Sequence, residues 1–192
     1  MNPSRRLLLV AFGVAAVQIG VLGWMIAGRA MILRSGNDVM LQVQPVDPRD
    51  LLRGDYVRLA YNISSLPREL FGDTLQDADP GEFTVYVRLA SDADGIWQPV
   101  AARYGSPPEA APEARHIDIR GTADYSPAAD METISVDYGI ERFYLPEGEG
   151  REIEEGIRER RFRMLVAVAR DGTAQIKAFY DGDTPIHSEP LY

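Results

Sequence analysis

One uninterrupted apolar run near the N-terminus constrains this chain more than any other feature of its sequence. The run extends from Leu7 to Gly28, and Gln18 is its only polar side chain. At about 1.5 Å per residue, a helix of this length reaches roughly 33 Å, which is enough to cross the hydrocarbon core of a bilayer. A core helix of a soluble domain would show a polar face, and this run has none. We therefore predict a transmembrane helix over residues 7–28.

The residues that flank the run bear on its orientation and on whether it is cleaved. Arg5 and Arg6 precede it and Arg29 and Arg34 follow it, so the basic residues are nearly balanced. We favour residues 1–6 on the cytoplasmic side, with the rest of the chain beyond the membrane. A cleaved signal peptide is the alternative, because small residues occur at 27–30. The run is longer than the usual signal-peptide core of about 7–15 residues, which favours an uncleaved anchor.

The pattern changes from continuous apolar to alternating after a linker that we expect at residues 29–38. Alternation with a period of two indicates half-buried strands. The Asp171-Gly172 pair between two apolar runs predicts a hairpin. Strands are expected at Asp38–Gln44, Tyr56–Ile63, Phe83–Leu89, His116–Gly121, Thr133–Tyr138, Met164–Ala169 and Ala174–Tyr180.

One short helix is expected at Arg151–Arg161, where Ile153 and Ile157 share a face. Glutamates crowd its start and arginines its end, which suits the helix dipole. The sequence thus predicts a mainly β domain (β-rich α+β) over residues 39–192, with this one short helix, behind a single transmembrane helix.

Composition excludes several classes of function. Among 192 residues there is no cysteine and there are two histidines, so disulfides, thiolate chemistry and a histidine-rich metal centre are excluded. The net charge is −9 and no basic run stands out in the part after the apolar run. Nucleic acid and anionic lipid surfaces are therefore unexpected partners, because both require dense positive charge. No cofactor is expected.

The most distinctive segment is Val46–Ile63. Within it, Gly54-Asp55-Tyr56-Val57-Arg58-Leu59-Ala60-Tyr61 fits the pattern G-D-Y-x-x-L-x-Y at every fixed position. The chain resembles the GDYXXLXY family of uncharacterised bacterial membrane-anchored proteins, and the block Tyr138–Gly148 is similar to a second segment of that family. The resemblance implies a single-pass protein of the bacterial inner (cytoplasmic) membrane with a periplasmic or extracellular domain. It also implies a partner among integral membrane proteins with several spans.

The motif has two physical interpretations. In the first it is a loop-to-strand junction, with Gly54 and Asp55 in the turn and Leu59 and Tyr61 on the buried face of the strand. In the second it is a binding loop, because clustered arginines and carboxylates bind polar ligands and loops often carry function. The candidate binding residues are Asp47, Arg49, Asp50, Arg53, Asp55, Tyr56 and Arg58.

Enzyme functions find less support in the sequence. Leu52–Val57 is similar to a strand segment of type I signal peptidases, but the serine nucleophile box is absent and Lys177 is the only lysine. Neither His116 nor His187 lies near a nucleophile motif. Asp92–Gly95 is better explained as a turn than as a calcium loop.

The sequence therefore assigns no catalytic residue and no metal ligand, and it leaves a small-molecule ligand open. We interpret the chain as an accessory or binding module of the bacterial envelope that acts with an integral membrane partner. The alternative is an extracytoplasmic hydrolase that uses carboxylates, because the many acidic residues offer many pairs.

Overall fold

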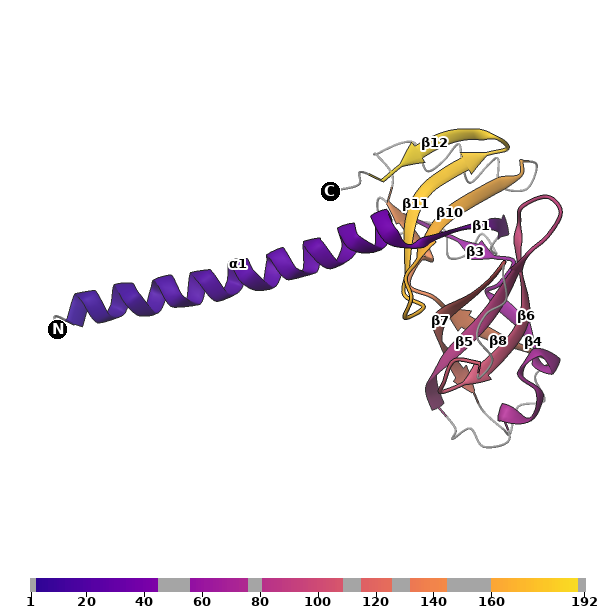
Figure 1. Cartoon of the computed structure of the whole chain (residues 1–192), viewed down its shortest axis with the longest axis horizontal. Coiled ribbons are helices and arrows are strands. Elements are labelled where there is room, and N and C mark those ends of the chain that lie inside the picture. The colour runs from indigo at the N-terminus through magenta and orange to yellow at the C-terminus, as the bar shows by residue number, and fades with distance from the viewer. Residues whose placement is uncertain are drawn as a thin grey trace.

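Figure 1 shows a long helix that leads into a domain of antiparallel strands. This computed structural model describes residues 3–44, 56–75, 81–108, 115–125, 132–144 and 160–189. The mainly β fold expected from the sequence is confirmed, with two five-stranded sheets and one two-stranded sheet.

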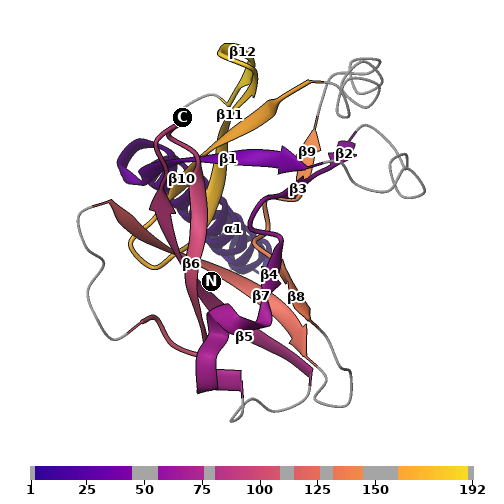
Figure 2. The same cartoon turned by 90° about the vertical axis from the view of Figure 1, so that its right-hand side faces the viewer.

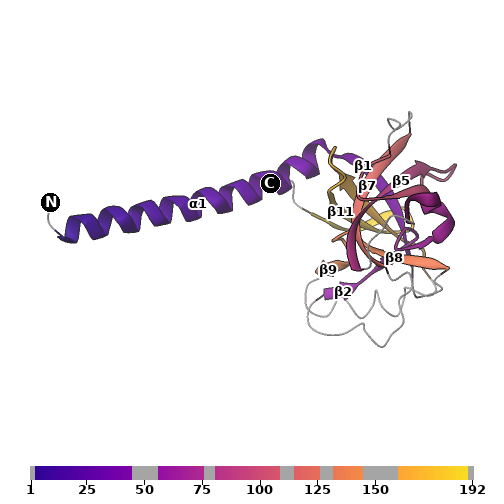
Figure 3. The ribbon, with the colours of Figure 1, turned by 90° about the horizontal axis from the view of Figure 1, so that it is seen from below.

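The helix α1 (Pro3–Ser35) projects away from the strands (Figures 1 and 3). Its segment Leu9–Arg34 is long and apolar enough to cross a membrane, and the most apolar stretch of that segment is not buried inside the molecule. A signal sequence near the N-terminus would share these properties. Large apolar side chains such as Phe12 and Trp24 are exposed, so this surface requires lipid or another protein around it.

The connection between α1 and the first strand is a single residue. The helix continues through most of the region expected to be a linker, and after Gly36 the strand β1 (Asn37–Gln44) begins. A side chain at Gly36 would approach the Ile32 carbonyl oxygen to 2.6 Å and the Ala167 Cβ to 3.2 Å. Leu33 is buried, and α1 contacts the strands β10 and β11. The helix end is therefore packed against the domain instead of being loosely linked to it.

The first sheet has the order β12-β11-β10-β1-β3. The expected hairpin at Asp171-Gly172 is confirmed, because β10 and β11 are antiparallel neighbours on either side of it. β10 contains consecutive buried residues, Val166 to Val168, as expected of a strand with neighbours on both sides. The bounds are β3 (Ala60–Tyr61), β10 (Phe162–Val168), β11 (Ala174–Asp181) and β12 (Thr184–Ser188).

The second sheet has the order β4-β8-β7-β5-β6. Its longest pairing joins β5 to β7, and the inward residues Phe83 to Leu89 alternate as the sequence predicts. Apolar side chains of both sheets form one core cluster. The bounds are β4 (Ser65–Pro67), β5 (Gly81–Ser91), β6 (Trp97–Tyr104), β7 (His116–Tyr125) and β8 (Thr133–Asp137).

The single strand expected at Tyr56–Ile63 is wrong, because the chain changes its pairing partner at Leu59. Before it, β2 (Tyr56–Arg58) pairs with β9 (Arg142–Tyr144). After it, β3 pairs with β1. From Leu59 onward the alternation of buried residues continues through Tyr61 and Ile63, as the sequence predicts.

Further elements, among them β4, β6, β12 and the helix η2, are absent from the sequence expectations. The strand β6 carries Pro99, β12 carries Pro185, and both alternate weakly, while η2 (Arg68–Leu75) is a 3-10 helix too short for a helical pattern. The expected helix at Arg151–Arg161 lies mostly outside the described residues, and its last two residues are not helical.

Substitution of Leu59 tests directly whether this residue belongs to the hydrophobic core. This side chain is 2% exposed, so Leu59→Ala should lower the free energy of unfolding by about 2–5 kcal/mol. Thermal unfolding of the full chain in detergent, followed by circular dichroism, measures the change. Val100→Ala, at an exposed position of β6, should change stability by less than about 0.5 kcal/mol. Equal melting of the two variants would contradict the core assignment.

Candidate functional site

The described part of the motif and the second sequence block are hydrogen-bonded to each other. In the β2–β9 pair, Val57 lies opposite Phe143. The Leu59 N–H donates to the Glu141 carbonyl oxygen at 2.8 Å. Just outside the two segments, the Val136 N–H donates to the Ser64 carbonyl oxygen at 2.9 Å. Figures 2 and 3 show β2 and β9 side by side at one side of the domain. The two segments that resemble the family therefore form one structural unit.

Two buried tyrosines, one in each segment, each donate a hydrogen bond to the other segment. The Tyr61 hydroxyl, from the motif, donates to the Ile140 carbonyl oxygen at 2.6 Å. The Tyr138 hydroxyl, from the second block, donates to the Ile63 carbonyl oxygen at 2.8 Å. Burial, followed by the charge of Glu141, raises the pKa of both hydroxyls well above the ordinary value. Both tyrosines therefore stay neutral and act as hydrogen-bond donors.

The turn at residues 137–141 places two carboxyl groups beside these tyrosines. Gly139 has a φ of 77°, which favours glycine, and its N–H donates to the Asp137 carboxylate at 2.9 Å. The Tyr138 N–H donates to the Glu141 carboxylate at 2.7 Å. The turn therefore holds the side chains of Asp137 and Glu141 close to each other.

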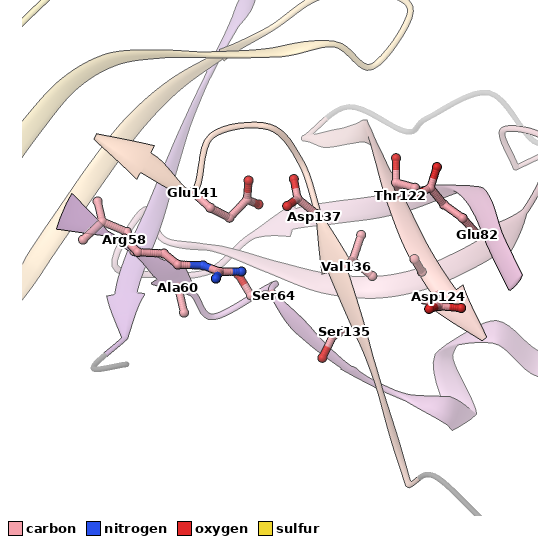
Figure 4. A pocket seen from close by; sticks show the side chains of 12 residues that line it. Arg58, Ala60, Ser64, Glu82, Thr122, Asp124, Ser135, Val136, Asp137 and Glu141 are labelled. Carbon is pink, nitrogen blue, oxygen red and sulfur yellow. The ribbon is translucent and has the colours of Figure 1, made fainter. Parts of the chain in front are cut away.

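These carboxyl groups line a groove of about 650 Å³ (Figure 4). A second acidic pair faces the same groove, because Glu82 of β5 and Asp124 of β7 are opposite one another in the strand register. Like charges directly opposite in a sheet are destabilising, so the stability of the fold does not account for the presence of this pair. The Arg58 side chain extends along the groove in Figure 4. The lining residues are Arg58, Leu59, Ala60, Ser64, Glu82, Thr122, Ala123, Asp124, Ser135, Val136, Asp137 and Glu141.

Glu141 is the most strongly perturbed acid of the groove. Burial, together with the hydrogen bond and the charge of Asp137, raises the pKa of Glu141 from 4.5 to about 7. The hydrogen bond from the Tyr138 N–H acts in the opposite direction. Near neutral pH this carboxyl therefore exchanges a proton readily, and a cation that binds beside it would favour the charged form.

The groove offers charge recognition and proton exchange, and its geometry limits other chemistry. Asp137 lies close enough to raise the pKa of Glu141 directly, whereas the two acids of glycoside hydrolases lie about 5–10 Å apart. Among the described residues, no group of three or more His, Asp or Glu side chains is placed to hold a metal ion.

The structure describes only part of the binding loop expected from the sequence. Tyr56 is in β2, Arg58 is exposed at the groove, and Leu59 and Tyr61 are buried as expected. The remaining motif and loop residues lie outside the described residues: Asp47, Arg49, Asp50, Arg53, Gly54 and Asp55.

Sequence reasoning missed the four acids of the groove. Only Glu141 lay in the motif or in the second block, and no sequence pattern indicated that its side chain is partly buried. The groove acids Glu82 and Asp124 are brought together by strand register, which one-dimensional patterns do not reveal.

Other polar residues considered in the sequence lie outside the lining of the acidic groove. The Asp92 carboxylate accepts hydrogen bonds from the N–H groups of Asp94 and Ile96, both at 2.9 Å, which makes it the centre of a turn. The His187 ring packs edge-on against Phe143, with ring centroids 5.2 Å apart. His116 is half-buried in β7.

Comparison with known proteins gives one result. The sequence model of the family described as GDYXXLXY protein matches residues 18–179, which is most of the chain and includes both blocks of the groove. The chain belongs to the GDYXXLXY family. No curated protein and no solved structure matches it. In this member of the family, the motif tyrosine Tyr61 and motif leucine Leu59 are core residues, and the groove lies against the same segment.

The raised pKa of Glu141 predicts a pH-dependent stability. The folded state binds the proton more tightly than the unfolded state, so the contribution of Glu141 is fully present below about pH 4.5 and is lost as the pH rises through about 7. Glu141→Gln keeps an acceptor for the Tyr138 N–H and cannot titrate. The free energy of unfolding of this variant minus that of the wild type should therefore be larger at pH 8 than at pH 5.

Denaturant unfolding of the full chain at these two pH values measures the difference. The change in the stability difference between the two pH values should stay below about 3 kcal/mol. Each unit of pKa shift corresponds to about 1.4 kcal/mol, and solvent screening of the half-exposed carboxyl reduces the effect further. Glu82→Gln is the matched charge control within the same groove. An equal effect of Glu141→Gln at both pH values would contradict the assignment.

Proposed function

We propose that this protein is a membrane-anchored accessory module of the bacterial envelope, which binds an integral membrane partner through the acidic groove beside its motif. The observation that carries the proposal is the second acidic pair. Glu82 and Asp124 lie opposite each other at an exposed position where repulsion weakens the sheet. A cationic segment of a partner would relieve this repulsion and that between Asp137 and Glu141.

Arg58 adds specificity to the groove. It lies at one side of the acidic lining, and among the described residues no carboxylate forms an ion pair with it. Its guanidinium can therefore pair with a carboxylate of the partner in the forked geometry typical of arginine. A partner loop that carries both charges, with the basic residues over the acids, fits this arrangement.

The exposed helix supports a partner within the bilayer. Six small residues recur along α1 at alternating spacings of three and four: Gly13, Ala16, Gly20, Gly23, Ala27 and Ala30. This spacing places them on one face, and small residues on one face allow close approach of a second membrane helix. No atom outside the local helix lies near the glycines of this face, so its surface is open.

The proposed compartment rests on the orientation that we favour for the anchor. With residues 1–6 in the cytoplasm, the acidic β domain would lie on the periplasmic or extracellular side of the inner membrane. The close packing of α1 on the first sheet would then hold the groove at a fixed height above the bilayer, where the extramembrane loops of a multispan protein lie.

Site-specific photocrosslinking in native membranes tests the proposal. A photoreactive residue in place of Ser135, which is exposed in the groove lining, should capture an integral membrane protein with several spans, identified by mass spectrometry. The same residue at Asp94, in the β5–β6 turn at the other end of β5, should not capture it. Arg58→Glu, and Tyr56→Ala two residues earlier in β2, should abolish co-purification of that protein without lowering the melting temperature.

Three outcomes would contradict the proposal. The first is the same capture at positions 135 and 94. The second is capture of a second copy of this chain alone. The third is co-purification that survives both substitutions.

A carboxylate hydrolase is the second candidate, and the raised pKa of Glu141 beside Asp137 favours it. Two carboxyls that share a proton can act as acid and base on a bound water molecule. The Glu141→Gln variant separates the two functions, since a hydrolase would lose turnover of its envelope substrate while a binding module has no turnover to lose.

A further inference from the structure

A second cavity, of about 460 Å³, lies where the helix α1 meets the β10–β11 turn. Gly28, Met31 and Ile32 of α1 form one side, and residues 169–171 form the other. It shares no lining residue with the acidic groove. In Figure 1 this turn lies beside the domain end of α1. If α1 spans the membrane as proposed above, the cavity lies at the level of the lipid headgroups.

We propose that this cavity binds the glycerophosphate group of an anionic phospholipid, whose acyl chains lie along α1. The proposal rests on the membrane anchoring proposed above. It assigns a lipid site to a surface that the function of the acidic groove does not use.

The helix side of the cavity suits the apolar part of a lipid. Trp24, Gly28 and Ile32 are four residues apart, so they share one face of α1, which lies to one side of the small-residue face. Trp24 is 81% exposed and lies one turn nearer the bilayer centre than Gly28. No atom lies within 4 Å of the position that a Gly28 Cβ would occupy, so space for an acyl chain remains above the indole.

The turn side of the cavity supplies the charge. Arg170 is exposed at its rim, and among the described residues no carboxylate forms an ion pair with it. The neighbouring Asp171 is already bonded, since its carboxylate accepts hydrogen bonds from the Thr173 N–H at 3.0 Å and the Thr173 hydroxyl at 2.9 Å. The first of these bonds is the main reason that the pKa of Asp171 is lowered. The Arg170 guanidinium therefore remains to pair with a phosphate.

The second sheet holds this turn in place. The Gly172 carbonyl oxygen accepts a hydrogen bond from the Arg120 N–H at 2.9 Å, and the Arg120 guanidinium donates to the Thr173 hydroxyl at 3.0 Å. Gly172 has a φ of 84°, and a side chain there would collide with Arg120. A fixed turn pre-organises the position of Arg170 and reduces the entropy lost on binding.

The proposed site brings together residues that no local sequence pattern connects. The chain is acidic and has no basic run, so general attraction to an anionic surface is not expected. Arg170 lies far from Gly28 in sequence, and only the packing of α1 on β10 and β11 brings the two together. The inference therefore concerns one bound lipid and does not require attraction to the membrane surface as a whole.

Fluorescence quenching of Trp24 in reconstituted bilayers tests this proposal. The full chain is placed in phosphatidylcholine bilayers with a minority of phosphatidylglycerol, and bromine is carried by the chains of one lipid or the other. Trp97 of β6, the only other tryptophan, gives a constant background. Brominated phosphatidylglycerol should quench Trp24 with an apparent affinity about fivefold above that of brominated phosphatidylcholine, as expected for one cationic contact near the surface.

Variants separate a defined site from a general charge effect. Arg170→Glu should remove the preference, and Arg170→Lys should keep most of it. Arg68→Glu is the matched control, because it makes the same charge change in η2, away from the helix end in Figure 1. Equal quenching of the wild type by the two lipids, or equal loss of preference in Arg68→Glu, would overturn the lipid site while leaving the anchor intact. Absence of quenching by either lipid would show that α1 is not inserted, and the proposed membrane function would fail with it.

Discussion

The reciprocal pair of tyrosine hydrogen bonds is the constraint on which the rest of the domain depends. Tyr61 satisfies a carbonyl of the second block, and Tyr138 satisfies a carbonyl beside the motif. A buried carbonyl without a partner destabilises a fold by about 1–3 kcal/mol, so the segments have to stay in this register. Residues 59–64 contain β3 and lead directly into β4, and these two strands belong to different sheets. The position of this segment therefore also fixes how the two sheets meet. The acidic groove lies along that junction.

The short connection at Gly36 fixes the position of the β domain relative to the helix α1. A single residue separates α1 from β1, and Leu33 packs against the domain. The Arg29 guanidinium also pairs with Glu189 at 3.3 Å, although an exposed pair of this kind adds little stability. The β10–β11 turn links the two regions of interest, since its Arg170 side lines the cavity at α1 while Thr173 bonds to Arg120 of the second sheet. The two proposed sites are thus carried by one continuous, hydrogen-bonded framework.

Local patterns in the sequence were sufficient for most strands and for the burial of Leu59 and Tyr61, because alternation reports directly on which face is buried. They were insufficient where the structure depends on partners distant in sequence. The strand break at Leu59 arises because its N–H bonds to Glu141, which is far along the chain. The groove could not be anticipated for the same reason: register brings Glu82 to Asp124, and a turn with a positive-φ glycine brings Asp137 to Glu141. The motif itself was visible, and its structural interpretation is supported for Leu59 and Tyr61.

The most direct test of this account is a double-mutant cycle on the two tyrosine hydroxyls. Tyr61→Phe and Tyr138→Phe each remove one oxygen and leave the ring in the core. Each should lower the free energy of unfolding by about 1–3 kcal/mol, measured by denaturant titration of the full chain in detergent. The double variant should depart from the sum of the two by at least about 0.5 kcal/mol, because both bonds hold the same two segments. Two single variants within about 0.5 kcal/mol of wild type, with additive effects, would show that the motif and the second block are not held together in this way.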